Sequence, residues 1–408
     1  MNMNEHYESH ARNTSPAQAR WAALLPISGA VFAAFLVIGM AMPVLPLHVH
    51  EGLGLDTSVV GLVAGSQFAA AILSRVWAGR QSDTRGPKFA MIARAASGGL
   101  YLLSLTAISR PAVSVMILLL GRLLLGIGES FIIIGGQSWA LAILTLRNTS
   151  KAIALVGSAM FAAFAVGAPI GSALYSRFGF AGVAVTTALL PLLTLLCFAA
   201  LQAVPPIPRQ QAGFMKIMGS VWMPGLGAAL SSIGFGAITA FSALLFVAHG
   251  WAAWPAFTAF AAVFILARLF LAHLADRFAA PRVALLSVLV EAVGLSLLAL
   301  SPSLAAALAG AALTGFGYSL IYPALGVEAV RSVPPQNRGL AMGAYTAFLD
   351  VALGFGTPVL GFLAERAGLG SAFAASALAA LGTAAIAGFL LSSRRVPRAP
   401  LACATFGQ

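Results

Sequence analysis

Apolar positions gather along this chain in runs of about 20 residues, separated by short breaks rich in proline, glycine and charge. An α-helix needs about that length to cross some 30 Å of hydrocarbon. A transmembrane β-barrel would instead show short segments of alternating hydrophobicity. The pattern predicts an all-α polytopic membrane protein with twelve spans, at residues 22–47, 58–78, 89–108, 112–144, 152–175, 181–201, 223–248, 255–274, 283–300, 303–329, 340–362 and 371–391.

The longest polar break, residues 202–216, divides the chain nearly in half. The first 20 residues are polar and lack the basic start and cleavage site of a signal peptide, so we expect a retained tail. The predicted organisation is an N-terminal tail (1–21), an N-terminal six-helix half (22–201), a central linker (202–222), a C-terminal six-helix half (223–391) and a C-terminal tail (392–408).

Charge refines this organisation. Only 8% of the residues are charged, yet the formal net charge is +12. Threading the chain through twelve spans puts 17 of the 23 Lys and Arg residues on the side of both termini and three, Arg110, Arg177 and Arg366, on the other. Cytoplasmic loops carry such an excess. Both termini are therefore predicted to be cytoplasmic, and the basic composition needs no nucleic-acid partner. Two cysteines give no disulfide framework.

The two halves resemble each other. Arg75 matches Arg268, and Asp83 matches Asp276, each 193 residues later. Further matches recur after 189 residues, pairing Gly126 with Gly315, Asn148 with Asn337, Gly167 with Gly356 and Pro169 with Pro358. The chain is therefore predicted to hold two pseudo-symmetric six-helix halves in the same orientation. Parallel repeats of six spans, with a substrate site between them, are the arrangement of major facilitator transporters.

Three motifs carry a resemblance to that family. The stretch GRQSDTRGPK resembles the signature between spans two and three, through Gly79, Asp83, Gly86 and Lys88, although Gln81 and Thr84 depart from it. LLLGRLLLGIG resembles the fourth-span motif with its buried arginine. GAPIG loosely resembles the fifth-span motif of drug:proton antiporters. GES and YPALGVE are similar to stretches of the YhhS-like group of bacterial members. The resemblance covers about residues 20–392 and implies a monomeric inner-membrane transporter without a cofactor, driven by the proton gradient.

A conformational latch is implied by the same resemblance. Asp83 would cap the start of span eleven and hold the cytoplasmic side shut, and the repeat predicts a sister latch at Asp276. Arg75 and Arg268 lie two helical turns before these aspartates and could partner acids on the same face. Alternatively, the bases of the motif only set topology. The full set assigned to the latch is Gly79, Asp83, Gly86, Lys88, Asp276, Arg75 and Arg268.

Ionisable residues within spans usually mark function, because burying a charge in the bilayer is costly. Arg122 and Glu129 lie about 10 Å apart on one face of span four, and Asp350 lies near the middle of span eleven. We predict that Glu129 or Asp350 takes up a proton and that Arg122 modulates it or binds an anion. A static buried ion pair is the alternative. Glu291 and Glu328 are weaker candidates of the same kind.

Other positions are expected to line the substrate cavity or to pack the helices. The cavity candidates are Phe35, Met40, Gln67, Gln137, Ser231, Phe235, Tyr318 and Tyr322. The packing glycines and proline are Gly126, Gly128, Gly167, Pro169 and Gly171, because small residues let membrane helices approach closely. The histidine spacing does not point to a metal site.

These features predict a non-enzymatic secondary transporter that moves a small organic molecule by alternating access, as a proton antiporter. Proton-coupled uptake of a sugar or organic acid is the alternative within the class. A lipid-modifying membrane enzyme is a remote alternative, because the acids are scattered singly over several spans instead of clustering at one depth. A channel is also remote, because duplicated halves favour alternating access.

Overall fold

The computed structural model describes residues 24–85, 111–143, 149–200, 214–271, 274–331, 333 and 338–393. Every regular secondary-structure element in these ranges is a helix. The predicted third span, 89–108, lies outside the described residues. The described elements are α3 (Leu24–Leu47), the π-helix η1 (His48–Gly52), α4 (Thr57–Arg85), α6 (Pro111–Ile143), α7 (Thr149–Ala200), α8 (Phe214–Ala248), α9 (Pro255–Leu271), α10 (Leu274–Arg277), α11 (Ala280–Leu300), α12 (Leu304–Arg331), α13 (Arg338–Ala367) and α14 (Leu369–Ser393).

The predicted membrane-spanning character is confirmed. Eight helices in the described part are long and apolar enough to cross a membrane. α7 contains two helices joined at Gly179, whose φ of 63° is the left-handed region that glycine adopts without strain. These two parts correspond to the predicted spans 152–175 and 181–201.

α8 differs from its prediction. It begins at Phe214, nine residues before the predicted start at 223, so the end of the predicted linker is helical. The apolar residues before Pro224 extend the helix, and Pro224 lies inside it. A proline removes one backbone hydrogen bond, which membrane helices tolerate when neighbouring groups compensate.

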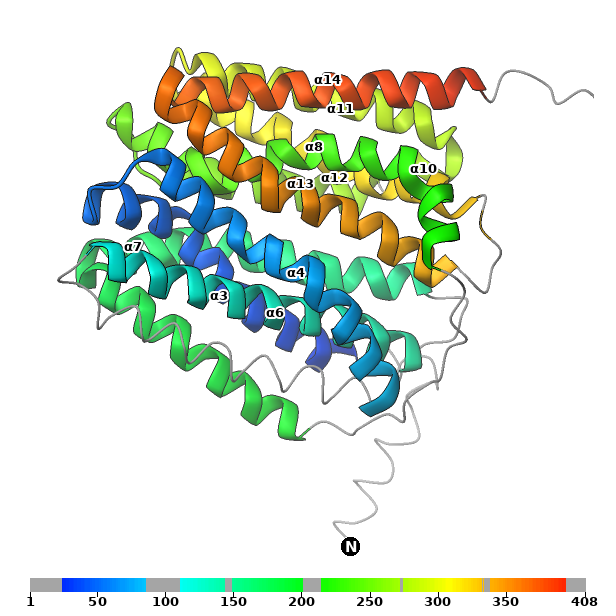
Figure 1. Ribbon diagram of the computed structural model, residues 1–408, viewed down its shortest axis with the longest axis horizontal. Helices are drawn as coiled ribbons and strands as arrows, with labels where there is room; N and C mark the ends of the chain where they lie inside the picture. Colours follow the sequence, from blue (N-terminus) through cyan, green and yellow to red (C-terminus); the bar gives the residue numbers. More distant parts are fainter. Residues whose placement is uncertain are drawn as a thin grey trace, which may run out of the picture.

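The helices form two groups along the chain (Figure 1). In the first group α3 packs on α7 and α4 on α6, and in the second α11 packs on α12 and α14. The groups meet mainly through two crossings, α4 with α13 and α7 with α9. Any movement of one group against the other must therefore slide or open these two crossings.

The α4–α13 crossing is closely packed on the side of the molecule where η1 lies, which we call the η1 side. A Cβ added at Gly61 would lie 2.6 Å from the Thr357 carbonyl oxygen, and one at Gly65 would lie 2.7 Å from Cδ of Pro358. Gly354 faces Ala69 from the other helix. Close approach of backbones through small residues is how membrane helices gain packing energy without a hydrophobic driving force.

Replacing Gly61 by valine should force α4 and α13 apart. Overpacking a tight contact costs about 1–3 kcal/mol, so Gly61→Val should lower the unfolding temperature of the purified protein by several degrees. Gly29→Val is the matched control, because no atom lies within 4 Å of its added Cβ. Equal melting temperatures for the two variants, measured by differential scanning fluorimetry in detergent, would contradict the close crossing.

Candidate functional site

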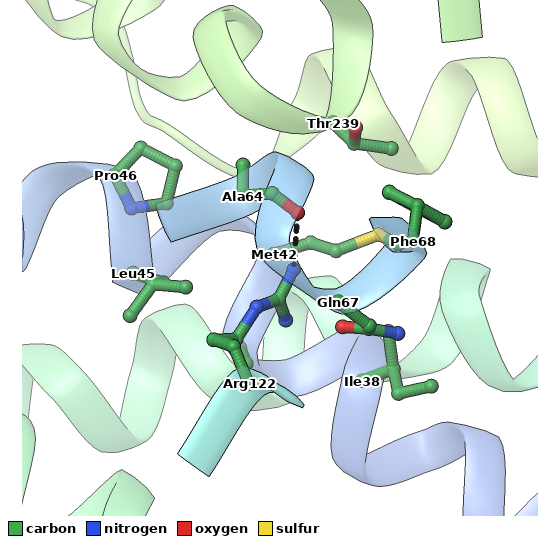
Figure 2. A pocket seen from close by; sticks show the side chains of 10 residues that line it. Ile38, Met42, Leu45, Pro46, Ala64, Gln67, Phe68, Arg122 and Thr239 are labelled. Atoms are coloured by element: carbon green, nitrogen blue, oxygen red, sulfur yellow. Dashed lines mark hydrogen bonds between the residues drawn. The ribbon is translucent and has the colours of Figure 1, made fainter. Parts of the chain in front are cut away.

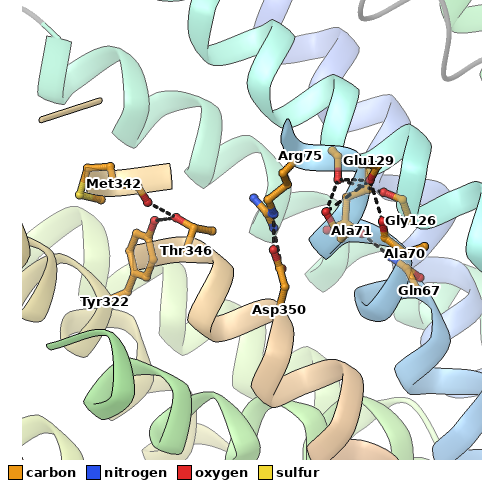
Figure 3. A network of polar contacts seen from close by, with 12 residues as sticks. Gln67, Ala70, Ala71, Arg75, Gly126, Glu129, Tyr322, Met342, Thr346 and Asp350 are labelled. Atoms are coloured by element: carbon orange, nitrogen blue, oxygen red, sulfur yellow. Dashed lines mark hydrogen bonds and ion pairs between the residues drawn. The ribbon is translucent and has the colours of Figure 1, made fainter. Parts of the chain in front are cut away.

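An ion pair joins the two groups at the α4–α13 crossing. Arg75 of α4 forms a salt bridge with Asp350 of α13, and its Nη2 donates a hydrogen bond of 2.8 Å to Oδ1 (Figure 3). The carboxylate is almost fully buried and the arginine is largely so. Sequence reasoning placed Arg75 in the latch and Asp350 in proton coupling, but it did not pair them. The pairing crosses 275 residues of chain.

A second polar contact lies within the first group. Gln67 of α4 donates from Nε2 to Oε2 of Glu129 on α6, and both side chains are buried. Two turns further along α4, the Ser74 hydroxyl donates to the Ser130 hydroxyl at 2.9 Å. Glu129 also lies close enough to Arg75 for their charges to interact. Figure 3 shows Arg75 with the Asp350 carboxylate on one side and the Gln67–Glu129 contact on the other.

Arg122 is anchored to the backbone of α4. Its Nη2 donates to the Ala64 carbonyl oxygen at 3.2 Å (Figure 2). Its Nε donates to the Val63 carbonyl oxygen at 3.4 Å. Backbone carbonyls of a membrane helix are good partners for a buried guanidinium because they satisfy it without a second charge. These bonds tie α6 to α4, a contact that sequence reasoning did not foresee.

A small cavity lies beside Arg122, between α3, α4, α6 and α8 (Figure 2). Gln67 is the one predicted cavity residue among its lining side chains. Arg122 was selected as a proton-coupling candidate and not for the cavity. Sequence reasoning did not select the apolar lining residues, because apolar residues of a membrane helix look alike whether they face a neighbour or a cavity. The rest of the lining is Ile38, Ala41, Met42, Leu45, Pro46, Ala64, Phe68, Arg122 and Thr239.

The second group contains a buried carboxylate of its own. Glu291 of α11 is fully buried, and its Oε2 accepts a hydrogen bond of 2.6 Å from Ser231 of α8. Its Oε1 has no hydrogen-bond partner in the described part of the chain. Ser231, a predicted cavity residue, therefore donates a hydrogen bond to this carboxylate. Sequence reasoning gave Glu291 less weight because span nine is peripheral in the family it resembles.

Two further predicted cavity residues, Phe235 and Tyr318, belong to an aromatic cluster between α8, α9 and α12. A third, Tyr322, contacts the ring of Tyr345 on α13. Phe235 stacks on Tyr318 with ring centroids 5.4 Å apart, and the Tyr318 hydroxyl lies 3.2 Å from the Ser232 hydroxyl. Tyr322 hydrogen-bonds Thr346 of α13 at 2.9 Å. The cluster brings together apolar rings and hydroxyl groups, the lining typical of sites for small organic molecules.

The remaining candidates lie in contacts between helices or outside the described residues. Phe35 packs edge-on against Phe164 of α7, and Met40 is buried where α3 meets Gly167 and Gly171. Gly126 lies against the Gln67 backbone. Gly86 and Lys88 lie outside the described residues, as do the side chains of Asp83, Asp276 and Gln137. In the described part, no group of three or more His, Cys, Asp or Glu residues could hold a metal ion.

Comparison with known proteins identifies the family. The sequence model of the Major Facilitator Superfamily matches residues 27–255 and 225–402. The chain belongs to the major facilitator superfamily. An uncharacterized MFS-type transporter of Salmonella typhimurium is 41% identical over 376 residues, covering 90% of this chain and 96% of that one. An uncharacterized MFS-type transporter of Pseudomonas aeruginosa is 40% identical over 396 residues, covering 95% and 98%.

Solved structures of this superfamily share the fold. The nucleoside transporter NupG superposes with a TM-score of 0.69 at 16% identity, covering 92% of this chain and all of that one. The chain is therefore a multi-pass membrane transporter of the major facilitator fold, and its relatives are transporters, not enzymes.

Removing one partner of the Arg75–Asp350 pair should cost more stability than removing both. An isolated charge left in a buried site costs about 3 kcal/mol, whereas replacing a buried pair by apolar residues is nearly neutral. Arg75→Gln should therefore lower the free energy of unfolding by about 3 kcal/mol, and the double variant Arg75→Met with Asp350→Leu by less than about 1 kcal/mol. Denaturant titration in detergent micelles measures both.

Arg331→Gln provides the control, because Arg331 is an exposed arginine and its contact with Glu328 lies within one helix, with the charged atoms 3.8 Å apart. A pair made by an exposed arginine within one helix contributes little. If Arg75→Gln were no more harmful than Arg331→Gln, the pair between the groups would not stabilise this arrangement.

Proposed function

We propose that this transporter exports a small organic molecule in exchange for protons, and that Asp350 is the residue that binds the coupled proton. The observation that supports this most is the position of the Arg75–Asp350 pair, which spans the crossing between the two helix groups. A carboxylate there has its counter-charge on the opposite group. Its protonation and the relative position of the groups are therefore linked.

The linkage follows from the cost of an isolated charge. With the two groups in contact, Arg75 neutralises Asp350, so the carboxylate can stay ionised. When α4 and α13 separate, Asp350 loses that partner and would remain as a single charge in a low-dielectric site. Binding a proton removes this cost. Opening of the crossing would thus favour proton uptake, and closing would favour proton release.

The direction of the cycle follows if both termini are cytoplasmic. The η1 side is then periplasmic, and the close packing of Gly61 and Gly65 on α13 closes the pathway on that side. In this state Asp350 is paired and has given up its proton toward the cytoplasm. Opening the periplasmic side would expose Asp350 to protons there. Export of substrate in that state completes an antiport cycle, in line with the fifth-span motif GAPIG.

Asp350→Asn should uncouple transport from the proton gradient, because asparagine cannot exchange a proton. In proteoliposomes, acidifying one side should drive proton flux through the wild type when substrate is present and none through the variant. Substrate exchange without a gradient should persist at a reduced rate. The assay records internal pH with a trapped dye while a panel of organic compounds is screened.

Glu365→Gln is the matched control, since Glu365 lies on the same helix but is exposed. Its coupling should equal that of the wild type. Glu129→Gln tests the second carboxylate in the same way. Proton-driven transport retained by both Asp350→Asn and Glu129→Gln would refute the coupling assignment.

Symport of a sugar or organic acid is the rival within the class. The two directions give opposite signals, because substrate added outside a vesicle releases protons from the vesicle in antiport and carries them inward in symport. Internal acidification on adding substrate would overturn the proposal of export.

The proposed latch has a separate test. Asp83→Asn should impair transport several-fold without changing the amount of protein in the membrane, because a neutral side chain caps a helix end less well than a carboxylate. Arg85→Gln in the same motif is the control, since Arg85 is not in the set assigned to the latch and we expect its charge only to set topology. Normal transport by Asp83→Asn would remove the latch from the mechanism.

A further inference from the structure

Arg268 is the counterpart of Arg75 in the second group, and it lies at the other crossing. It is half-buried near the end of α9, with its guanidinium carbon 5.6 Å from the centre of the Phe264 ring. Phe264 in turn stacks on Phe161 of α7, with ring centroids 3.6 Å apart. Arg268 therefore lies one helical turn beyond the α7–α9 contact, as Arg75 lies at the α4–α13 contact.

The two arginines differ in their partners. Arg75 is neutralised by Asp350, whereas Arg268 has no ion pair or hydrogen bond to any carboxylate whose side chain the structure describes. Those carboxylates are Glu51, Asp56, Glu129, Glu291, Glu328, Asp350 and Glu365. A cation at membrane depth is costly without a counter-charge, and a ring face supplies only part of that stabilisation.

The internal repeat explains the difference. Asp350 follows Phe161 by 189 residues, the same offset that relates Pro358 to Pro169. Phe161 therefore occupies on α7 the place that Asp350 occupies on α13. At one crossing the arginine meets a carboxylate, and at the other the equivalent position holds a phenylalanine ring. Among the described side chains, the second crossing has the arginine but no carboxylate paired with it.

The surroundings of Arg268 fit an organic ligand. Tyr318, Tyr322 and Tyr345 lie near enough to interact electrostatically with its guanidinium. The Tyr318 ring is 6.0 Å from Phe264 and stacks on Phe235. An arginine beside this aromatic cluster offers a planar fork for a carboxylate and ring faces for an apolar body.

We propose that Arg268 binds the anionic group of the transported molecule, so that the substrates are organic anions with an aromatic or apolar body. This inference deepens the proposed function and rests on it, since it names the substrate class of the same transporter. The ligand carboxylate supplies at the α7–α9 crossing the charge that Asp350 supplies at the α4–α13 crossing. With substrate bound, each of the two crossings then holds an arginine paired with a carboxylate.

Equilibrium binding to the purified full chain in nanodiscs of zwitterionic lipid tests this site. Three probes of matched shape are used, namely naphthoate, the neutral naphthamide and the cationic naphthamidine, each titrated by calorimetry. The wild type should bind naphthoate at least about tenfold more tightly than naphthamide, as expected for a hydrogen bond between charged groups. Naphthamidine should bind most weakly.

Four variants test whether Arg268 causes the preference for naphthoate over naphthamide. Arg268→Gln should abolish it, and Arg268→Lys should keep it at lower affinity, because lysine retains the charge but not the fork. Phe161→Asp should also abolish it, because the new carboxylate would give Arg268 an internal partner. Arg366→Gln is the matched control, since Arg366 lies 4.2 Å from the Phe362 ring on an exposed surface. It should bind like the wild type.

Three results would overturn the proposal. They are equal binding of naphthoate and naphthamide, absence of binding by all three probes, and a preference for naphthoate that survives in Arg268→Gln. The measurement is made without a proton gradient, so it does not depend on coupling. Anion preference together with failure of the Asp350→Asn test would refute only the antiport mechanism, and the reverse result would refute only the substrate class.

Discussion

The free-energy cost of burying a charge without a partner inside a membrane is the constraint on which the buried contacts of this structure depend. Each strongly buried ionisable side chain described above has a specific neighbour. Arg75 meets Asp350, Glu129 accepts from Gln67, Arg122 donates to carbonyls of α4, and Glu291 accepts from Ser231. Three of these contacts each join helices of the same group, two in the first group and one in the second, and they hold those helices together. The pair of Arg75 and Asp350 alone among the four joins different groups.

This difference separates rigid parts from movable ones. The contacts within a group can persist through a transport cycle, so they need not change protonation. A pair between the groups cannot persist if the groups separate, because both partners then lose their counter-charge together. The glycine-lined crossing of α4 and α13 beside the pair lets the helices approach closely enough to form it. Packing and electrostatics thus depend on the same two helices.

The sequence predicts the helices well and their contacts poorly. Hydrophobic length alone locates spans such as 255–274, found as α9, and the bias of Lys and Arg predicts their orientation. The start of α8 was missed because the apolar residues 214–222 precede a proline that reads as a break. The Arg75–Asp350 pair was missed because helical periodicity relates residues within one helix and carries no information on which other span faces it. Gln67 was proposed for the cavity, and its contact with Glu129 was not foreseen for the same reason.

The internal repeat carries information that local periodicity lacks. Equivalent positions in the two groups have the same place in the fold, so a difference between them marks what each copy does. Gln67 and Glu129 correspond to Phe260 and Tyr318, a polar pair in one group and an aromatic pair, 6.3 Å between ring centroids, in the other. Asp350 corresponds to Phe161 in the same sense. Among the described side chains, the first group and its crossing hold the paired charges, and the second crossing holds aromatic rings beside Arg268. Under the two proposals above, proton handling and ligand recognition would belong to different copies of the repeat, and rocking of the groups would connect them.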